Sequence, residues 1–158
     1  MEKLEEYFRT RVSEEAYDFF AVFSRFEYAL KKGGFRRKSK ASPDWETFAR
    51  SLPGAFYEKV SDAEEASIYF RDPPKHLEKG DNQGVKWSKL PQTPDDAHTL
   101  FKSLNTARNN LFHGDKKHDD LRDRRLMQAG LYVLNTAYDY ACQEKEFSEF
   151  IAEMAHGL

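Results

Sequence analysis

The chain of 158 residues has little cysteine, no long uncharged apolar run and no excess of basic residues. Its one cysteine, Cys142, excludes an intramolecular disulfide, and we expect this thiol to be a small buried group rather than a nucleophile. No apolar stretch has the length of a membrane span, and the charged N-terminus lacks the apolar core of a signal peptide. The default expectation is therefore a reducing, cytoplasmic location.

Other absences limit the kinds of binding site that the chain is expected to have. The formal net charge of −2 does not indicate nucleic-acid binding, so a chain of this composition that bound nucleic acid would have to use a local basic patch. The glycines lie outside any strand-to-helix pattern, which excludes a phosphate-cradling loop. Four histidines are scattered among polar residues, are expected on the surface and lack convincing metal-ligand spacing (His76, His98, His118 and His156). We therefore expect neither a metal nor a cofactor.

Aromatic residues are abundant, with 13 Phe and 8 Tyr, and they predict a Phe-rich core that needs no disulfide. We read Trp45 and Trp87 as packing residues. The fold class is all-α: one domain over residues 1–158, built as a single helical bundle of about five to six helices. Apolar residues at steps of three and four from Leu4 to Leu30 predict one long first helix, ended by Gly33.

Caps and apolar periodicity place the other helices. We expect them over residues 43–52, 61–71 (from the capping-box spacing of Ser61 and Glu64), 94–112, 119–144 and 147–154. The 119–144 helix has apolar residues on more than one face, which predicts a central position. Residues 72–92 hold three prolines and two glycines and are expected to form one long irregular loop with a short hairpin near Asn82.

Two basic clusters each leave two interpretations open. Residues 31–40 contain six basic residues and no acid, which favours a solvated loop over a phosphate-contacting patch. The second cluster combines Lys116 and Lys117 with Arg122, Arg124 and Arg125, at the start of the last long helix. It fits either a basic rim that binds RNA or a salt-bridged helix start, since aspartates interleave with it.

One short motif carries the functional argument: Arg108-Asn109-Asn110-Leu111-Phe112-His113, at the end of a predicted helix. The same Arg-to-His spacing recurs from Arg71 to His76, but two intervening prolines forbid a helix there. On a helix of about 100° per residue, Arg108 falls within the apolar arc. A guanidinium in that position is costly unless it is paired or faces a crevice.

At these residues the chain resembles the HEPN family (higher eukaryotes and prokaryotes nucleotide-binding domains), most of all its plasmid- and defence-associated bacterial members. The family motif is an Arg, a polar residue, three variable residues and a His, at the end of one bundle helix and before the next long one. Arg108, Asn109 and His113 match it. The helical layout agrees over most of the chain, whereas the loop over residues 72–92 has no counterpart.

The resemblance implies a cytoplasmic, metal-independent endoribonuclease in a defence, stress or toxin context. Its partners would be RNA, a second copy of the chain in a homodimer, and an antitoxin or regulatory protein. His113 suits general acid–base catalysis, Arg108 suits binding of the scissile phosphate, and Asn109 suits orientation of either group. The expected product carries a 2′,3′-cyclic phosphate.

One position departs from the family. In HEPN toxins paired with a nucleotidyltransferase antitoxin, a modified Tyr follows the His by two positions, whereas this chain has Asp115. Control by that route is therefore not expected. The alternative to a nuclease is a non-catalytic HEPN-like module that dimerises or binds nucleotide or protein, in which Arg108 pairs with a core carboxylate and His113 only closes the helix.

Overall fold

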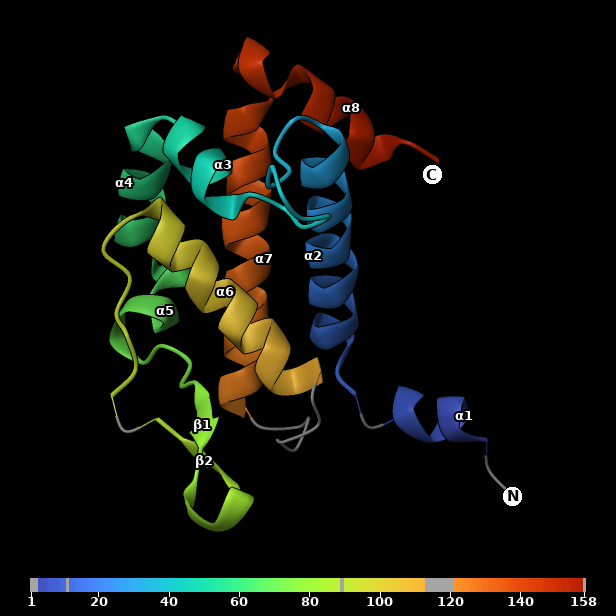
Figure 1. The fold of residues 1–158 in the computed structure, drawn as a ribbon, viewed down its shortest axis with the longest axis vertical. Coiled ribbons are helices and arrows are strands. Elements are labelled where there is room, and N and C mark those ends of the chain that lie inside the picture. Colours follow the sequence, from blue (N-terminus) through green and yellow to red (C-terminus); the bar gives the residue numbers. More distant parts are fainter. Residues whose placement is uncertain (1–2, 11, 89, 113–120, 158) are drawn as a thin grey trace.

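The computed structural model describes residues 3–10, 12–88, 90–112 and 121–157, and these ranges form a helical bundle (Figure 1). The fold class is therefore all-α, as predicted. The helices of the described ranges are α1 (Leu4–Arg9), α2 (Glu14–Lys32), α3 (Trp45–Ser51), α4 (Gly54–Asp62), α5 (Ile68–Arg71), α6 (Ala97–Phe112), α7 (Leu121–Ala141) and α8 (Ser148–Ala155). Short 3₁₀ turns cover Glu64–Ala66, Asp81–Gln83 and Lys145–Phe147.

Helix α7 is the centre of the bundle. It packs against α2, α4, α5, α6 and α8, which confirms the position predicted from its apolar residues on more than one face. Helices α2 and α7 lie side by side and run in the same direction (Figure 1). Gly130 allows their close approach, because a Cβ atom at this position would lie 2.4 Å from Cε2 of Phe19.

The core is rich in phenylalanine, as the composition predicts. Eight Phe side chains are almost completely buried (Phe19, Phe23, Phe26, Phe48, Phe56, Phe101, Phe147 and Phe150). The ring of Trp45 lies 5.3 Å from that of Phe23 and 5.1 Å from that of Phe101, between centroids. Trp45 is thus the packing residue that the sequence analysis expected, and it joins α3 to α2 and α6.

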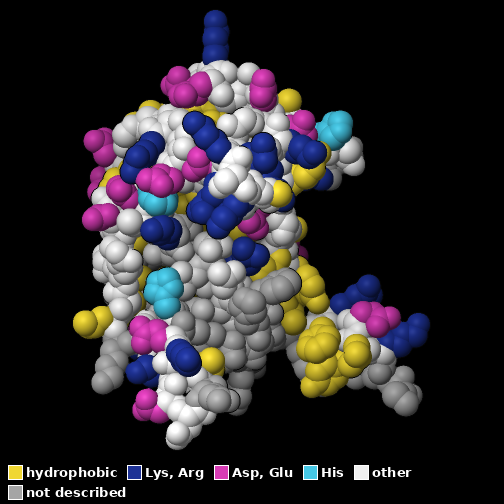
Figure 2. All heavy atoms as spheres, in the orientation of Figure 1, with side chains coloured by type: hydrophobic (Ala, Val, Ile, Leu, Met, Phe, Trp, Pro, Cys, Tyr) yellow, Lys and Arg dark blue, Asp and Glu magenta, His cyan; other side chains and the backbone are white. Residues whose placement is uncertain are grey.

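The prediction of one continuous first helix is wrong. Ser13 takes an extended conformation and its side chain accepts a hydrogen bond from the Ala16 backbone N–H, so α2 begins after it. Helix α1 stands apart from the bundle and buries none of its residues (Figure 1). Hydrophobic side chains gather on this helix, at the lower right of Figure 2, and include Leu4, Tyr7 and Phe8. The apolar spacing continues across the break, but no packing holds it in one helix.

The predicted helix over residues 61–71 is also wrong. Residues 54–62 form α4, which buries Phe56 and Val60. The Ser61 hydroxyl donates to the Glu58 carbonyl inside that helix instead of capping a new one. Only the short α5 remains of the predicted segment, and it follows a 3₁₀ turn.

Helices α3 and α6 begin two or three residues later than predicted. In each case an aspartate caps the helix: Asp44 accepts from the Thr47 backbone N–H at 3.1 Å, and Asp96 accepts from that of Thr99 at 2.7 Å. Both carboxyl groups have a pKa below the usual range. For Asp44 the largest cause is the hydrogen bond from the Thr47 hydroxyl, and for Asp96 it is the bond from the Thr99 backbone N–H.

The segment between α5 and α6 contains the predicted hairpin. Strand β1 (Leu77–Lys79) pairs with β2 (Val85–Trp87) in antiparallel register. Asn82 in the connecting turn has φ of 56°, a left-handed conformation that asparagine tolerates. The rest of the described loop is irregular, as expected.

The exposure of Cys142 and of the basic run can also be compared with the predictions from the sequence. Cys142 follows the end of α7 and is exposed, so the expectation of a buried thiol is wrong. Residues 36–40 of the basic run are exposed, in agreement with a solvated loop.

Within the described ranges, no helix combines the length and apolar character that crossing a membrane requires.

Candidate active site at the end of helix α6

Helix α6 presents the first five residues of the motif, and its last described residue is Phe112. Arg108 and Asn109 are half-buried, and Asn110 and Leu111 are buried. His113 lies outside the described residues, as do Lys116, Lys117 and Asp115. The structure therefore describes the arginine and the polar residue of the motif, but not its histidine.

Arg108 is held by groups from two helices. Its Nη2 atom donates to Oδ1 of Asn105 at 3.0 Å and lies 3.5 Å from Oε1 of Glu27 on α2. The guanidinium carbon is 5.0 Å from the centroid of the Phe23 ring, a cation–π contact. The sequence placed Arg108 on the apolar side of α6, where a guanidinium is costly unless it is paired or faces a crevice. Its contacts with Asn105, Glu27 and Phe23 provide that pairing.

The arginine nevertheless keeps access to solvent. The side chains of Arg108 and Glu27 are each 25% exposed, and the Nε atom of Arg108 has no hydrogen-bond partner among the residues described. A buried N–H without an acceptor costs about 1–3 kcal/mol. Because the Nε atom itself is buried, an anion from solvent would meet the exposed part of the guanidinium rather than this donor.

Asn110, a variable position of the motif, fixes the neighbouring loop. It is 5% exposed, and its Nδ2 atom donates to the Lys75 carbonyl at 2.8 Å. One turn earlier, Oγ1 of Thr106 lies 3.4 Å from Nδ1 of His76. This role of Asn110 was not predicted from the sequence, because its partner, Lys75, is 35 positions away in the chain.

The described arginines of the second basic cluster have different surroundings. Arg122 is bound to Asp72: its Nε atom lies 2.7 Å from Oδ2, and its Nη2 atom also donates to the carbonyls of Asp72 and Pro73. Arg125, one turn later, is exposed. The structure thus brings one of the three described arginines, Arg122, into the salt-bridged helix start that the sequence left open.

The second Arg-to-His pair does not repeat the motif, although His76 lies against Thr106 of α6. Arg71 ends α5 and His76 follows in irregular backbone, so the second Arg-to-His pair lacks the helical geometry of the motif, as the prolines predict. Among the residues described, no group of three or more His, Cys, Asp or Glu side chains is placed to hold a metal ion.

The chain was also compared with known proteins. No protein-family model, curated protein or solved structure matches it.

Proposed function

We propose that this chain is a HEPN-type, metal-independent endoribonuclease that acts as a homodimer in the cytoplasm, in a defence, stress or toxin system. The observation that carries the proposal is the placement of Arg108. A cation on the apolar side of α6 is oriented by Glu27 and Asn105, remains partly exposed, and stands five positions before His113.

The proposed reaction is an in-line transesterification. The ribose 2′-oxygen attacks the adjacent phosphorus while one His113 imidazole takes its proton, and the bond from phosphorus to the 5′-oxygen breaks. The His113 imidazolium of the second copy protonates that leaving oxygen, which leaves a 2′,3′-cyclic phosphate and a 5′-hydroxyl. Arg108 binds the phosphate and stabilises its developing charge, and Asn109 orients the phosphate or the imidazole.

The pairing of Arg108 with Glu27 favours a second candidate, a non-catalytic module that dimerises or binds nucleotide or protein. In that case the arginine serves the packing of α6 on α2. Its replacement would then lower stability or assembly and affect no cleavage, since removing one partner of a part-buried ion pair leaves the other uncompensated.

The decisive experiment is cleavage of a mixed RNA pool in EDTA, with analysis of the product ends. We expect the wild type to give cyclic phosphate ends and the His113→Ala variant to lose at least about 100-fold in rate, the lower range for a general acid–base group. His156→Ala is the matched control, because His156 is exposed and follows α8, away from the motif.

Two results would contradict the proposal. If His113→Ala cleaves as fast as the His156→Ala control, His113 is not the acid–base group. If the folded wild-type dimer cleaves no RNA while Arg108→Ala lowers the unfolding temperature, the non-catalytic module is the better description.

A further inference from the structure

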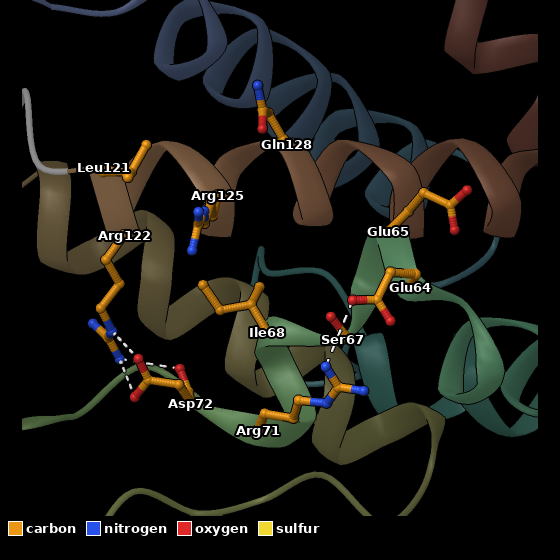
Figure 3. Close-up of a pocket in the computed structure, with 10 residues that line it drawn as sticks. All are labelled: Glu64, Glu65, Ser67, Ile68, Arg71, Asp72, Leu121, Arg122, Arg125 and Gln128. Atoms are coloured by element: carbon orange, nitrogen blue, oxygen red, sulfur yellow. Dashed lines mark hydrogen bonds and ion pairs between the residues drawn. The ribbon is translucent and has the colours of Figure 1, made fainter.

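A pocket of about 710 Å³ lies between α5, with the turn before it, and the first turns of α7 (Figure 3). Its lining includes three arginines, Arg71, Arg122 and Arg125, from both walls. Leu121, which begins α7 and lines the pocket, follows His113 by eight positions in the chain. One lining residue of the pocket is therefore the first described residue after the segment 113–120, which contains the proposed catalytic histidine.

Arg122 shapes one end of the pocket. Its guanidinium is paired with the Asp72 carboxylate and binds two backbone carbonyls, so its charge is largely compensated (Figure 3). These bonds tie the start of α7 to the segment after α5. Arg122 is thus a positioning residue for the pocket and a poor candidate for a phosphate ligand.

Arg125 differs from Arg122 in its exposure and in its partners. It is exposed, and it makes no hydrogen bond or ion pair with any residue in the described ranges. Its side chain points from α7 toward α5 in Figure 3. Across the pocket, Nη1 of Arg71 lies 3.5 Å from Oε1 of Glu64, but both side chains are highly exposed, so this pair is weak and exchangeable. Two arginines are therefore available to bind an anion.

The other lining residues limit the size of that anion. Glu64 and Glu65 line the same pocket and would repel a second phosphate. Between the charged ends, Ile68 and the 60% exposed Leu121 offer apolar contact. One phosphate attached to one flat, weakly polar group matches this arrangement, and the volume lies within the roughly 300–1,000 Å³ of small-ligand pockets.

We propose that this pocket holds one nucleotide of a single-stranded RNA substrate, with its phosphate on Arg125 and Arg71 and its base against Leu121 and Ile68. The inference rests on the proposed function for the choice of RNA as the ligand. A phosphate ligand is a charge-assisted, bidentate partner for each guanidinium.

The test measures RNA binding rather than cleavage. A labelled single-stranded RNA of about 12 nucleotides, within the site sizes of single-strand binders, is titrated with the full-length His113→Ala chain at several salt concentrations. Arg125→Ala and Arg71→Ala are added to this background. Arg124→Ala is the matched control, because Arg124 is the neighbouring exposed arginine of α7 and does not line the pocket.

We expect Arg125→Ala to weaken binding about tenfold and to lower the slope of log K against log salt by about 0.7, the value for one phosphate contact on a single strand. Arg71→Ala should act in the same direction, and Arg124→Ala should leave both quantities near the parent values. Circular dichroism and thermal unfolding establish that each variant is folded.

The outcomes separate this inference from the proposed function. Equal losses for Arg124→Ala and Arg125→Ala, or no RNA binding at all, would overturn the pocket assignment. Binding of adenosine 5′-monophosphate through Arg125 without binding of RNA would assign the pocket to a free nucleotide and overturn the choice of RNA. If the wild type binds RNA through Arg125 but never cleaves it, the inference stands and the nuclease proposal fails. If the wild type cleaves RNA but neither binding nor cleavage depends on Arg125, the nuclease proposal stands and the pocket assignment fails.

Discussion

At the scale of single residues, polar side chains from distant parts of the chain fix the end of α6 and the start of α7. Arg108 reaches Glu27, Asn110 reaches the carbonyl of Lys75, and Arg122 reaches Asp72. The Arg108 pair is partly solvated, so its net contribution to stability is small and its main effect is to orient the guanidinium. These contacts position the motif without sealing it from solvent.

The first prediction concerns two glycines with opposite surroundings. We expect Gly130→Ala to lower the free energy of unfolding by about 1–3 kcal/mol, the range for overpacked cores, because the new methyl group would lie 2.4 Å from the buried Phe19 ring. Gly54→Ala is the control, since no atom lies within 4 Å of a Cβ at that position. It should leave stability unchanged or raise it by up to about 1 kcal/mol. Urea unfolding measures both, and similar effects of the two variants would contradict the packing argument.

At the scale of elements, the sequence predicted the long helices better than the short ones. The positions of α6 and α7 followed from sustained apolar spacing, and both helices are also held by the core. The break at Ser13 escaped prediction because the apolar spacing runs through it, and only a local cap separates the two helices. Helix α4 was missed because Pro53 and Gly54 look like an interruption, whereas they stand at its start.

The candidate site was predictable only in part, for a similar reason. The motif and the helix that carries it follow from short-range patterns in the chain, so both could be predicted from the sequence. The partner of Arg108 is 81 positions away, and that of Arg122 is 50 positions away. Nothing in a local pattern specifies which carboxylate a folded chain brings to an arginine, so Glu27 and Asp72 could be found only in the structure.

A second prediction concerns the cap of α3. Because the pKa of Asp44 is lower in the folded protein than the ordinary aspartate value of 3.8, its ionised carboxylate stabilises the fold above that pH. The contribution disappears as the pH falls through the folded-state pKa. Asp44→Ala should therefore cost about 0.5–2 kcal/mol at neutral pH, as for other caps, and progressively less in acid.

Urea unfolding at a series of pH values checks this prediction. The stabilities of the wild type and Asp44→Ala should approach each other as the pH falls through the folded-state pKa of Asp44, below which its carboxyl group is protonated in both states. Asp44→Asn retains an oxygen acceptor for the Thr47 N–H but has no charge to titrate, so its stability should show less of this pH dependence. A difference between wild type and Asp44→Ala that stays constant down to acid pH would show that the charge of Asp44 has no part in the cap.

At the scale of the whole molecule, the candidate site lies at one end of the bundle. The end of α6 and the start of α7 both lie at the lower end of the helical bundle in Figure 1, whereas α8 lies at the top. Acidic and basic side chains are interleaved over the face in Figure 2, in keeping with the net charge of −2. Long-range attraction of RNA by the whole surface is therefore weak, and the proposed RNA binding would depend on local groups such as Arg108 and Arg125.

The final prediction follows from the need for one histidine as base and another as acid. If two copies supply them, the active species is a dimer of the 18.5 kDa chain, and the cleavage rate per chain should fall on dilution below the dimer dissociation constant. Sedimentation at the same concentrations should show the fall in activity coinciding with the loss of dimer. A chain that sediments as a monomer and cleaves with a constant rate per chain would exclude the shared site.

Mixing experiments test the same point without dilution. Excess His113→Ala chain should convert wild-type protein into heterodimers with a single His113, and the rate per wild-type chain should then fall toward that of the variant. Excess His156→Ala chain should form heterodimers that keep both copies of His113 and should leave the rate per chain that contains His113 unchanged. Because the two variants differ only in which histidine is lost, unequal inhibition identifies a site shared between copies, and equal behaviour excludes it.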